Sequence, residues 1–96
     1  TAASNTEAIA NVTVPAKTPV IAGEEGICKG CGVATLSISY YDLGMTTGKM
    51  AAKILTGEAD ISTMPIEFTT ATPKYNTSMC ETLGITPLEG YTAIAE

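Results

Sequence analysis

Residues 32–58 read GVATLSISYYDLGMTTGKMAAKILTGE, and the hydrophobic period changes within this stretch. Its first half carries residues that favour a β-strand, at Val33, Leu36, Ile38 and Tyr40. In its second half the inward positions recur at helical spacings of four, three and four residues, at Leu43, Thr47, Met50 and Ile54. The stretch therefore predicts a strand that runs directly into an amphipathic helix.

Both ends of this helix carry termination signals. The carboxylate of Asp42 can accept hydrogen bonds from the unpaired N–H groups of a first turn, so we expect Asp42 to be the N-cap rather than a ligand group. Gly57 can adopt the left-handed conformation that ends many helices. The helix is therefore expected to run from about Tyr41 to Gly57.

A shorter helix is expected near the start of the chain. Ser4 or Asn5 can cap it, and Glu7 follows Ser4 at the three-residue spacing of a capping box. Ile9 and Val12 are expected to face the core. The helix is short because a proline follows it closely, and proline cannot donate to the helical hydrogen bonds.

The remaining segments complete the pattern. Residues 19–22, PVIA, form an apolar run typical of a buried strand in a parallel sheet, and residues 65–70, PIEFTT, predict another strand. Asn76 is expected to cap a last helix that ends at Gly84, and residues 87–96 are expected to form a loose tail. Strands thus alternate with helices, which predicts an α/β fold built on a parallel sheet.

Several blocks of the sequence together resemble one protein family. They are SNTEAIAN (residues 4–11), PVIAGEEGICKGCG (19–32), GVATLSISYYDLGMTTGKMAAKILTGEA (32–59) and MPIEF (64–68), followed by YN, then LGI and a proline. In this order and spacing they resemble the C-terminal third of ABC transporter substrate-binding proteins of the tryptophan/tyrosine type, which have the type 1 periplasmic-binding fold.

The resemblance implies how the chain is divided. A two-lobed protein of this family is about three times longer, so we expect the chain to be a fragment covering mainly the second lobe. Residues 1–38 are expected to belong to the second lobe, residues 39–58 to be a helix of the first lobe, and residues 59–96 to return to the second lobe and end in the tail.

One implied ligand-binding segment lies at the start of the chain. The family's Asp-Asn-Thr segment falls on Ser4, Asn5 and Thr6, so a serine stands where the family has an acid. An acid can pair with the ammonium group of a ligand, whereas a hydroxyl offers a neutral hydrogen bond of roughly half the strength. This departure weakens the expectation that the ligand is an amino acid held through its ammonium group.

A second implied segment is the glycine-rich stretch of residues 23–32, which has four glycines. Glycine lets backbone approach a ligand closely, so we expect a functional loop, with a plain surface connection as the alternative. Glu24 and Glu25 lie in this loop and can recognise a cationic or polyhydroxylated ligand. It is no phosphate-binding loop, because the Gly-Lys-Ser/Thr ending is absent.

The third implied segment lies where the chain is expected to cross between lobes. Ser39 can supply a hydroxyl and Tyr40 an aromatic wall for the ligand. The alternative for Tyr40 is a half-buried tyrosine that packs within the fold. Hinge residues are expected near Ser4, Ser39 and Met64.

The function implied by the resemblance is solute capture for import. The protein would bind a small molecule, such as an amino acid, by closure of two lobes, and deliver it to the membrane permease of an ABC importer. The expected location is extracytoplasmic, in the periplasm or as a cell-surface lipoprotein. The alternative is a ligand-sensing lobe of a regulatory or receptor protein, because the same fold serves both roles.

Composition argues against two other classes of function. Five basic and ten acidic residues give a net charge of −5 without a basic stripe, so we expect no nucleic-acid binding. The chain has no histidine, and the adjacent Glu24 and Glu25 would point to opposite faces of an extended backbone. We therefore expect neither catalysis nor a cofactor.

The three cysteines leave alternatives open. Cys28 and Cys31 have the CxxC spacing of redox and zinc sites, yet a glycine-rich loop before a strand is not the helix N-terminus that a redox pair uses. With Cys80 as the only other thiol, a zinc site would need carboxylate ligands. Structural thiols, an extracellular disulfide and a metal or redox role all remain possible from sequence.

A last expectation concerns the long helix. If this helix normally docks on the other lobe, the isolated chain exposes its apolar stripe, made of Leu43, Met50, Ile54 and Leu55. Exposed apolar patches of a few hundred Å² favour association. We therefore expect the isolated chain to self-associate.

Overall fold

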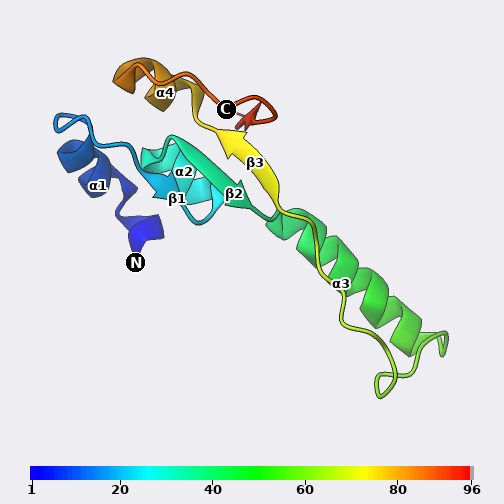
Figure 1. The fold of residues 1–96 in the computed structure, drawn as a ribbon. Coiled ribbons are helices and arrows are strands. Elements are labelled where there is room, and N and C mark those ends of the chain that lie inside the picture. The colour runs from blue at the N-terminus through cyan, green and yellow to red at the C-terminus, as the bar shows by residue number, and fades with distance from the viewer. Residues whose placement is uncertain (96) are drawn as a thin grey trace. The chain divides into compact units, whose positions relative to one another are not determined.

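The computed structural model describes residues 1–95, which divide into two compact units (Figure 1). Unit 1 comprises Thr1–Ser37 and the chain from Ala71 onward, and unit 2 comprises Ile38–Thr70. The chain leaves unit 1 after Ser37 and re-enters it at Ala71. Among residues 1–95, none of the helices combines the length and the apolar character that a membrane span requires.

Unit 1 is built on a four-stranded sheet with the strand order β1-β2-β3-β4. The parallel pairs are β1 with β2 and β3 with β4, whereas the central pair, β2 with β3, is antiparallel. The strands are β1 (Ile21–Ala22), β2 (Ala34–Ser37), β3 (Thr72–Tyr75) and β4 (Thr92–Ala93). The predicted α/β fold class is confirmed, and the antiparallel centre arises where the chain returns from unit 2.

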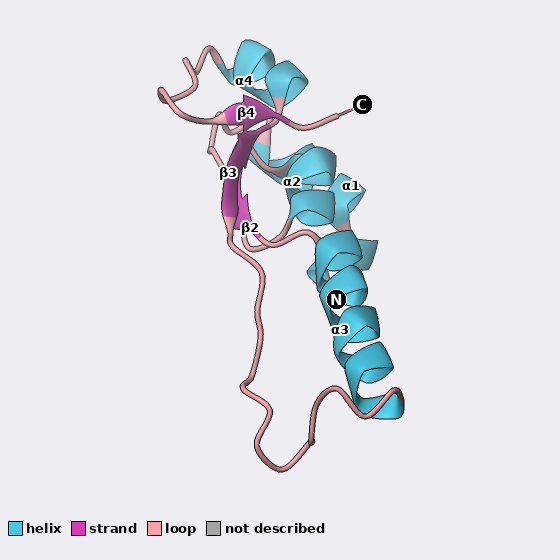
Figure 2. Ribbon diagram, turned by 90° about the vertical axis from the view of Figure 1, so that its right-hand side faces the viewer, coloured by secondary structure: helices cyan, strands magenta, loops and turns pink. Residues whose placement is uncertain are grey.

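Helix α2 lies along one face of this sheet, with α1 beyond it (Figure 2). Helix α2 contacts α1 and the strands β1 and β2. The helical elements of unit 1 are η1 (Ala2–Ser4), α1 (Thr6–Thr13), α2 (Glu25–Cys31) and α4 (Thr77–Leu83). The buried core joins Ala22 of β1, Cys28 of α2 and Ile94 beyond β4, with Ile27 packed against it.

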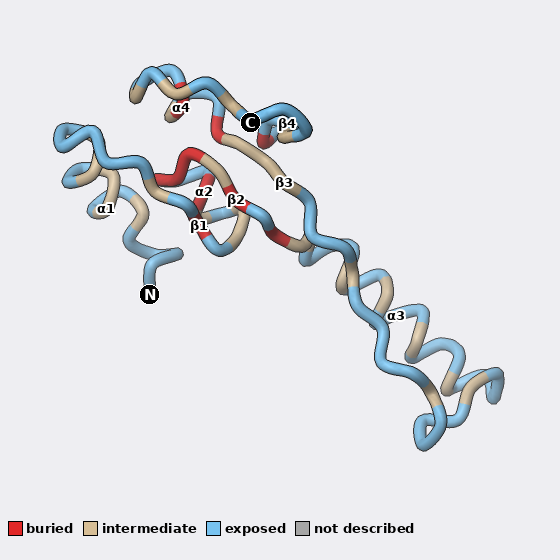
Figure 3. Tube along the Cα trace, viewed as in Figure 1, coloured by how far each residue is buried: buried red, intermediate tan, exposed pale blue. Residues whose placement is uncertain are grey.

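Burial alternates along β2 as expected for a sheet with one covered face (Figure 3). Thr35 and Ser37 are 1% and 6% exposed, whereas Leu36 between them is 62% exposed. Because α2 is the helix that contacts β2, the buried face is the one that α2 covers.

The glycine-rich stretch is a helix, which corrects the predicted loop. Glu24 has an extended backbone and its carboxylate accepts a hydrogen bond from the N–H of Ile27, so it caps α2. Cys28 and Cys31 lie on the inner side of this helix and are 0% and 2% exposed. The loop was predicted because glycine permits sharp turns and close backbone approach. Burial of these two side chains and the Glu24 cap favour a helix instead.

The expected strand at residues 65–70 is wrong. Ile66 and Phe68, predicted to share a buried face, are 91% and 84% exposed in a segment without strand pairing. The strand begins instead at Thr72, where the backbone pairs with β2. Hydrogen bonding to a neighbouring strand, rather than local β-propensity, decides where β3 forms.

The predicted loose tail is also wrong for the described residues up to 95. Strand β4 pairs with β3, and the N–H of Ile94 donates a hydrogen bond to the carbonyl of Tyr75 over 2.9 Å. Ile94 is 6% exposed and belongs to the core. Burial of Ile94 and pairing of β4 with β3 thus hold residues 92–94 in place, although their sequence carries no strong strand signal.

The long helix, α3 (Tyr40–Leu55), lies in unit 2 and begins earlier than predicted. Ser39 caps it, because its Oγ accepts a hydrogen bond from the N–H of Asp42 over 3.2 Å. Asp42 is therefore a first-turn residue and not the cap. Gly57 has φ 81°, which confirms the left-handed position expected beyond the helix end.

The two short helices at the ends of unit 1 differ in how well they were predicted. Asn76 caps α4 by accepting a hydrogen bond from the N–H of Met79, and Gly84 ends it with φ 69°, both as predicted. Asn5 precedes α1 but makes no side-chain cap, and Ser4 forms its capping box with Thr1 instead of Glu7. Val12, predicted to face the core, is 71% exposed.

We predict that Gly48→Ala stabilises α3. A Cβ at Gly48 would meet no atom within 4 Å, and alanine has a higher helix propensity, so the free energy of unfolding should rise by about 1 kcal/mol. Urea denaturation followed by circular dichroism measures the change. A loss of stability would show that another part of the protein, or a second copy, packs closely on this position.

Candidate functional site

The parallel strands β1 and β2 end at one edge of the sheet in unit 1, which we call the carboxyl edge. Gly23, Glu24 and Glu25 follow β1 at this edge. Ser37 ends β2 and pairs with Thr72, the first residue of the antiparallel β3, so β3 begins where β2 ends. Ligands of open α/β sheets bind outside the carboxyl ends of the strands, which makes this edge the candidate site.

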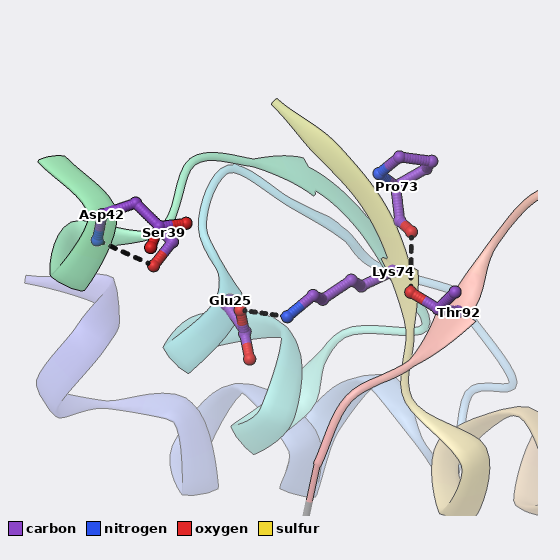
Figure 4. A network of polar contacts seen from close by, with 6 residues as sticks. All are labelled: Glu25, Ser39, Asp42, Pro73, Lys74 and Thr92. Carbon is purple, nitrogen blue, oxygen red and sulfur yellow. Dashed lines mark hydrogen bonds and ion pairs between the residues drawn. The ribbon is translucent and has the colours of Figure 1, made fainter. Parts of the chain in front are cut away.

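An ion pair spans this edge from sheet to helix (Figure 4). Nζ of Lys74 on β3 lies 3.1 Å from Oε2 of Glu25 at the start of α2. The two side chains are 29% and 35% exposed, so the pair is partly shielded from solvent. The contact places a positive charge directly against the Glu25 carboxylate.

The neighbouring carboxylate is engaged as well. Glu24 accepts a hydrogen bond from the N–H of Ile27 and so satisfies the first turn of α2. Both acidic residues predicted to recognise a ligand therefore already have partners within unit 1. Neither presents a free carboxylate, which counts against a site that selects strongly for cations.

The segment of Ser4, Asn5 and Thr6 lies beside α2. Element η1, which contains Ser4, contacts α2, and Thr6 packs against Gly30 of that helix. Oγ of Ser4 and Nδ2 of Asn5 both donate hydrogen bonds to the carbonyl of Thr1, over 3.1 and 2.6 Å. Residues 4–6 thus lie against α2, and Glu24 and Glu25 lie at the N-terminal end of the same helix.

Ser39 and Tyr40 are the second and third residues of unit 2, which begins at Ile38. The Oγ atom of Ser39 is used to cap α3, and Tyr40 is 65% exposed. Within the described residues the Tyr40 ring is therefore not half-buried, and its contact with a ligand stays a prediction. The ring is available for contact with another molecule.

Two residues of the carboxyl edge were missed from sequence. Lys74 is separated from Glu25 by 49 residues, and no local pattern links them. Thr35, which pairs with Lys74 across the strands, is 1% exposed, and its Oγ1 has no hydrogen-bond partner among the described residues. Thr92 of β4 completes the neighbourhood, where its Oγ1 donates to the carbonyl of Pro73 over 3.5 Å (Figure 4).

An apolar hollow of about 180 Å³ lies toward the opposite ends of β1 and β2. Ile21 and Ala34, which begin these strands, line it together with residues that follow α4. No charged side chain lines it. The hollow is an apolar gap in the packing, and none of the predicted ligand-binding residues lines it.

The three cysteines are free and buried in the described structure. Cys28 lies at the middle of α2 and Cys31 at its end, so neither is at the N-terminus where a helix dipole activates a thiol. Burial first, and then the nearby Cys80, raise the pKa of the Cys28 thiol to about 11. Burial also raises the pKa of Cys80. Among residues 1–95, no group of three or more His, Cys, Asp or Glu residues is arranged to hold a metal ion.

Titration of Cys28 should make stability depend on alkaline pH. The folded thiol keeps its proton up to about pH 11, whereas the unfolded thiol releases it near its ordinary pKa of 9.0. The folded state then binds more protons, so the free energy of unfolding should fall by about 2 kcal/mol from pH 9 to pH 11. Denaturation at several pH values tests this, with Cys28→Ala as the control that should flatten the dependence.

The comparison with known families is unambiguous. A family model of ABC transporter substrate binding proteins matches residues 1–96. Proteins of this family bind small-molecule solutes, work with ABC transporter components, are not enzymes and are typically extracytoplasmic. No curated protein matches the chain.

Solved structures agree with this match. The ligand-free, open structure of CD0873, a substrate binding protein with adhesive properties from Clostridium difficile, has a TM-score of 0.75 and 30% identity over 96% of this chain. An ABC domain in complex with L-Trp from Streptococcus pneumonia has a TM-score of 0.74 and 27% identity over 88% of this chain. A conserved domain protein from Vibrio cholerae, at 24% identity over 95% of the chain and TM-score 0.65, shares the fold.

The chain spans 32% of the length of the Clostridium difficile protein, 31% of the Streptococcus protein and 40% of the Vibrio protein. The sequence-based recognition is confirmed by the family match and by these structures together. The chain belongs to the ABC transporter substrate-binding protein family.

Proposed function

We propose that the chain is part of the extracytoplasmic solute-binding component of an ABC importer, which captures a small solute such as an amino acid between two lobes. The family match over residues 1–96 and the similarity to a protein solved with L-Trp support this proposal. The observation that carries it is the division of the chain into two compact units that are joined where β2 ends and β3 begins.

The division gives each unit a proposed place in the whole protein. Unit 1 would belong to the second lobe, and unit 2, with α3, to the first lobe. The return to the second lobe would then lie between Thr70 and Ala71, where unit 2 ends, and not at residue 59 as expected from the sequence. Rotation at the two connecting segments, 37–38 and 70–71, would let the lobes close on a solute, and a closed form is what a permease can recognise.

The solute is proposed to bind at the carboxyl edge of the sheet. Ser4, Asn5 and Thr6 would contribute hydroxyl and amide groups from beside α2, and Glu24 and Glu25 would border the site. Ser39 and Tyr40 are proposed as contacts from the first lobe. The whole protein would lie in the periplasm or be held at the cell surface as a lipoprotein, with a membrane permease as its partner.

Solute binding and lobe closure can be tested on the longest natural chain that carries this sequence. Titration calorimetry with a panel of L-amino acids and other small polar solutes should give saturable one-to-one binding for one chemical class. Small-angle scattering should then show a smaller radius of gyration with that solute than without it. Absence of saturable binding across the panel would overturn the proposal, and binding without a change in size would overturn lobe closure.

Tyr40 offers a direct test of the proposed contact from the first lobe. Tyr40→Ala should weaken solute binding by about 1 kcal/mol, because an aromatic side chain gives up stacking and buried area when it is truncated. Tyr41→Ala is the matched control, since Tyr41 is 75% exposed on the same helix turn and is not proposed to touch the solute. Equal effects of the two substitutions would remove Tyr40 from the site.

A further inference from the structure

The carboxyl edge contains one cation whose position the structure fixes. Lys74 projects from the middle of β3, and its Nζ reaches Glu25 at the first turn of α2 over 3.1 Å (Figure 4). Thr35, the partner of Lys74 across the strands, is buried under α2 on the same sheet. The lysine is therefore anchored by its strand and held by one carboxylate.

Lys74 reduces the negative formal charge of the three groups at this edge, Glu24, Glu25 and Lys74, from −2 to −1. The Glu25 charge is compensated by Lys74, and the Glu24 carboxylate accepts a hydrogen bond from the N–H of Ile27 in the first turn of α2. Without Lys74 the two adjacent carboxylates would leave the edge strongly negative. With it, the edge repels anions less and attracts cations less than the two carboxylates alone would.

We propose that Lys74 is a positioning residue that sets the charge preference of the solute site, so that the carboxyl edge selects solutes without a net positive charge. The inference rests on the proposed function, because it assigns the class of solute taken by that same site. Lys74 acts by holding and neutralising Glu25, and it limits how strongly this carboxylate can attract an ammonium or guanidinium group.

A second feature supports a role in the site beyond fold stability. The pair is only partly buried, with 29% and 35% of the two side chains exposed, and such pairs contribute little to folding. About a third of each side chain stays exposed, so a bound molecule can reach the ion pair. A zwitterionic solute can then meet a positive and a negative group that lie side by side.

The test uses the longest natural chain and four probes of similar backbone chemistry: L-tryptophan, L-glutamine, L-lysine and L-glutamate. Calorimetry gives the dissociation constant of each for the wild-type protein and for Lys74→Met. We expect the wild type to prefer a neutral probe. In Lys74→Met the ratio of L-lysine to L-glutamine affinity should rise about tenfold, because the freed Glu25 attracts the cation.

Three further variants separate positioning from a structural effect. Lys74→Arg should restore the wild-type preference, since arginine keeps the charge opposite Glu25. The double variant Lys74→Met with Glu25→Gln should also restore it, because both charges are removed. Lys29→Met removes an exposed charge elsewhere on α2 and should leave the affinity ratio unchanged. A thermal melt of each variant shows whether the fold is retained.

The outcomes distinguish the inference from the proposed function. If the wild type binds a neutral probe and Lys74→Met, while folded, leaves the L-lysine to L-glutamine ratio unchanged, the inference is overturned and solute binding stands. A wild-type preference for L-lysine would overturn it as well. If the wild type binds none of the four probes, binding of an amino acid is overturned together with this inference.

Discussion

Asn76→Ala is expected to lower the free energy of unfolding of unit 1 by about 3 kcal/mol. The Asn76 side chain is 7% exposed and is bonded at both ends. Its Nδ2 donates to the carbonyls of Cys28 and Lys29 over 3.0 and 3.1 Å, and its Oδ1 accepts from the N–H of Met79 over 3.1 Å. One amide therefore joins the end of α2 to the start of α4.

Two matched substitutions resolve the parts of this effect. Asn76→Asp keeps an oxygen that can cap α4 but replaces the donor facing the α2 carbonyls with a charge, so it should be at least as damaging as alanine. Ser39→Ala removes only an exposed cap of α3 and should cost about 1 kcal/mol. Urea denaturation of the three variants gives the comparison. Equal costs for Asn76→Ala and Ser39→Ala would show that the bonds to α2 contribute nothing.

Gly30→Val is expected to destabilise the contact between α1 and α2 by about 3 kcal/mol. A Cβ at Gly30 would lie 2.5 Å from both Cβ and Oγ1 of Thr6 and 2.8 Å from its Cγ2. Thr6 is branched at Cβ and begins α1, so it cannot turn away without moving the helix. The segment of Ser4, Asn5 and Thr6 would shift with it, and solute affinity should fall in the same variant.

A double-mutant cycle tests that the clash is with Thr6. Gly30→Ala and Thr6→Gly are each expected to destabilise alone, and their combination should be more stable than the sum of the two effects implies. Removal of Thr6 Cβ makes room for the new methyl group at position 30. Strict additivity of the two substitutions would contradict the packing of Thr6 on Gly30.

Helix ends were predicted best, because their signals are local. Asn76, Gly84 and Gly57 take the cap or left-handed positions that their side chains, or the lack of one, allow. Asp42 shows the limit of such signals. Both Ser39 and Asp42 can cap a helix, and the structure uses Ser39, so α3 starts at Tyr40.

The candidate site was predicted in part. Glu24 and Glu25 lie at the carboxyl edge, but the sequence suggested free carboxylates in a loop, and the structure has a capping residue and an ion-paired residue of α2. Lys74 could not be assigned, because 49 residues separate it from Glu25 and an ion pair leaves no periodic pattern.

The sequence by itself determined the family, the α/β class, the strand leading into α3 and the helix ends at Asn76 and Gly84, because each depends on residues close together in the chain. Only the tertiary structure decided that residues 25–31 are helical, that β3 starts at Thr72, and that Ile94 closes the core. These features depend on burial and on strand pairing between distant segments. Their stabilising free energy exists only once those segments have met, so no local pattern could predict them.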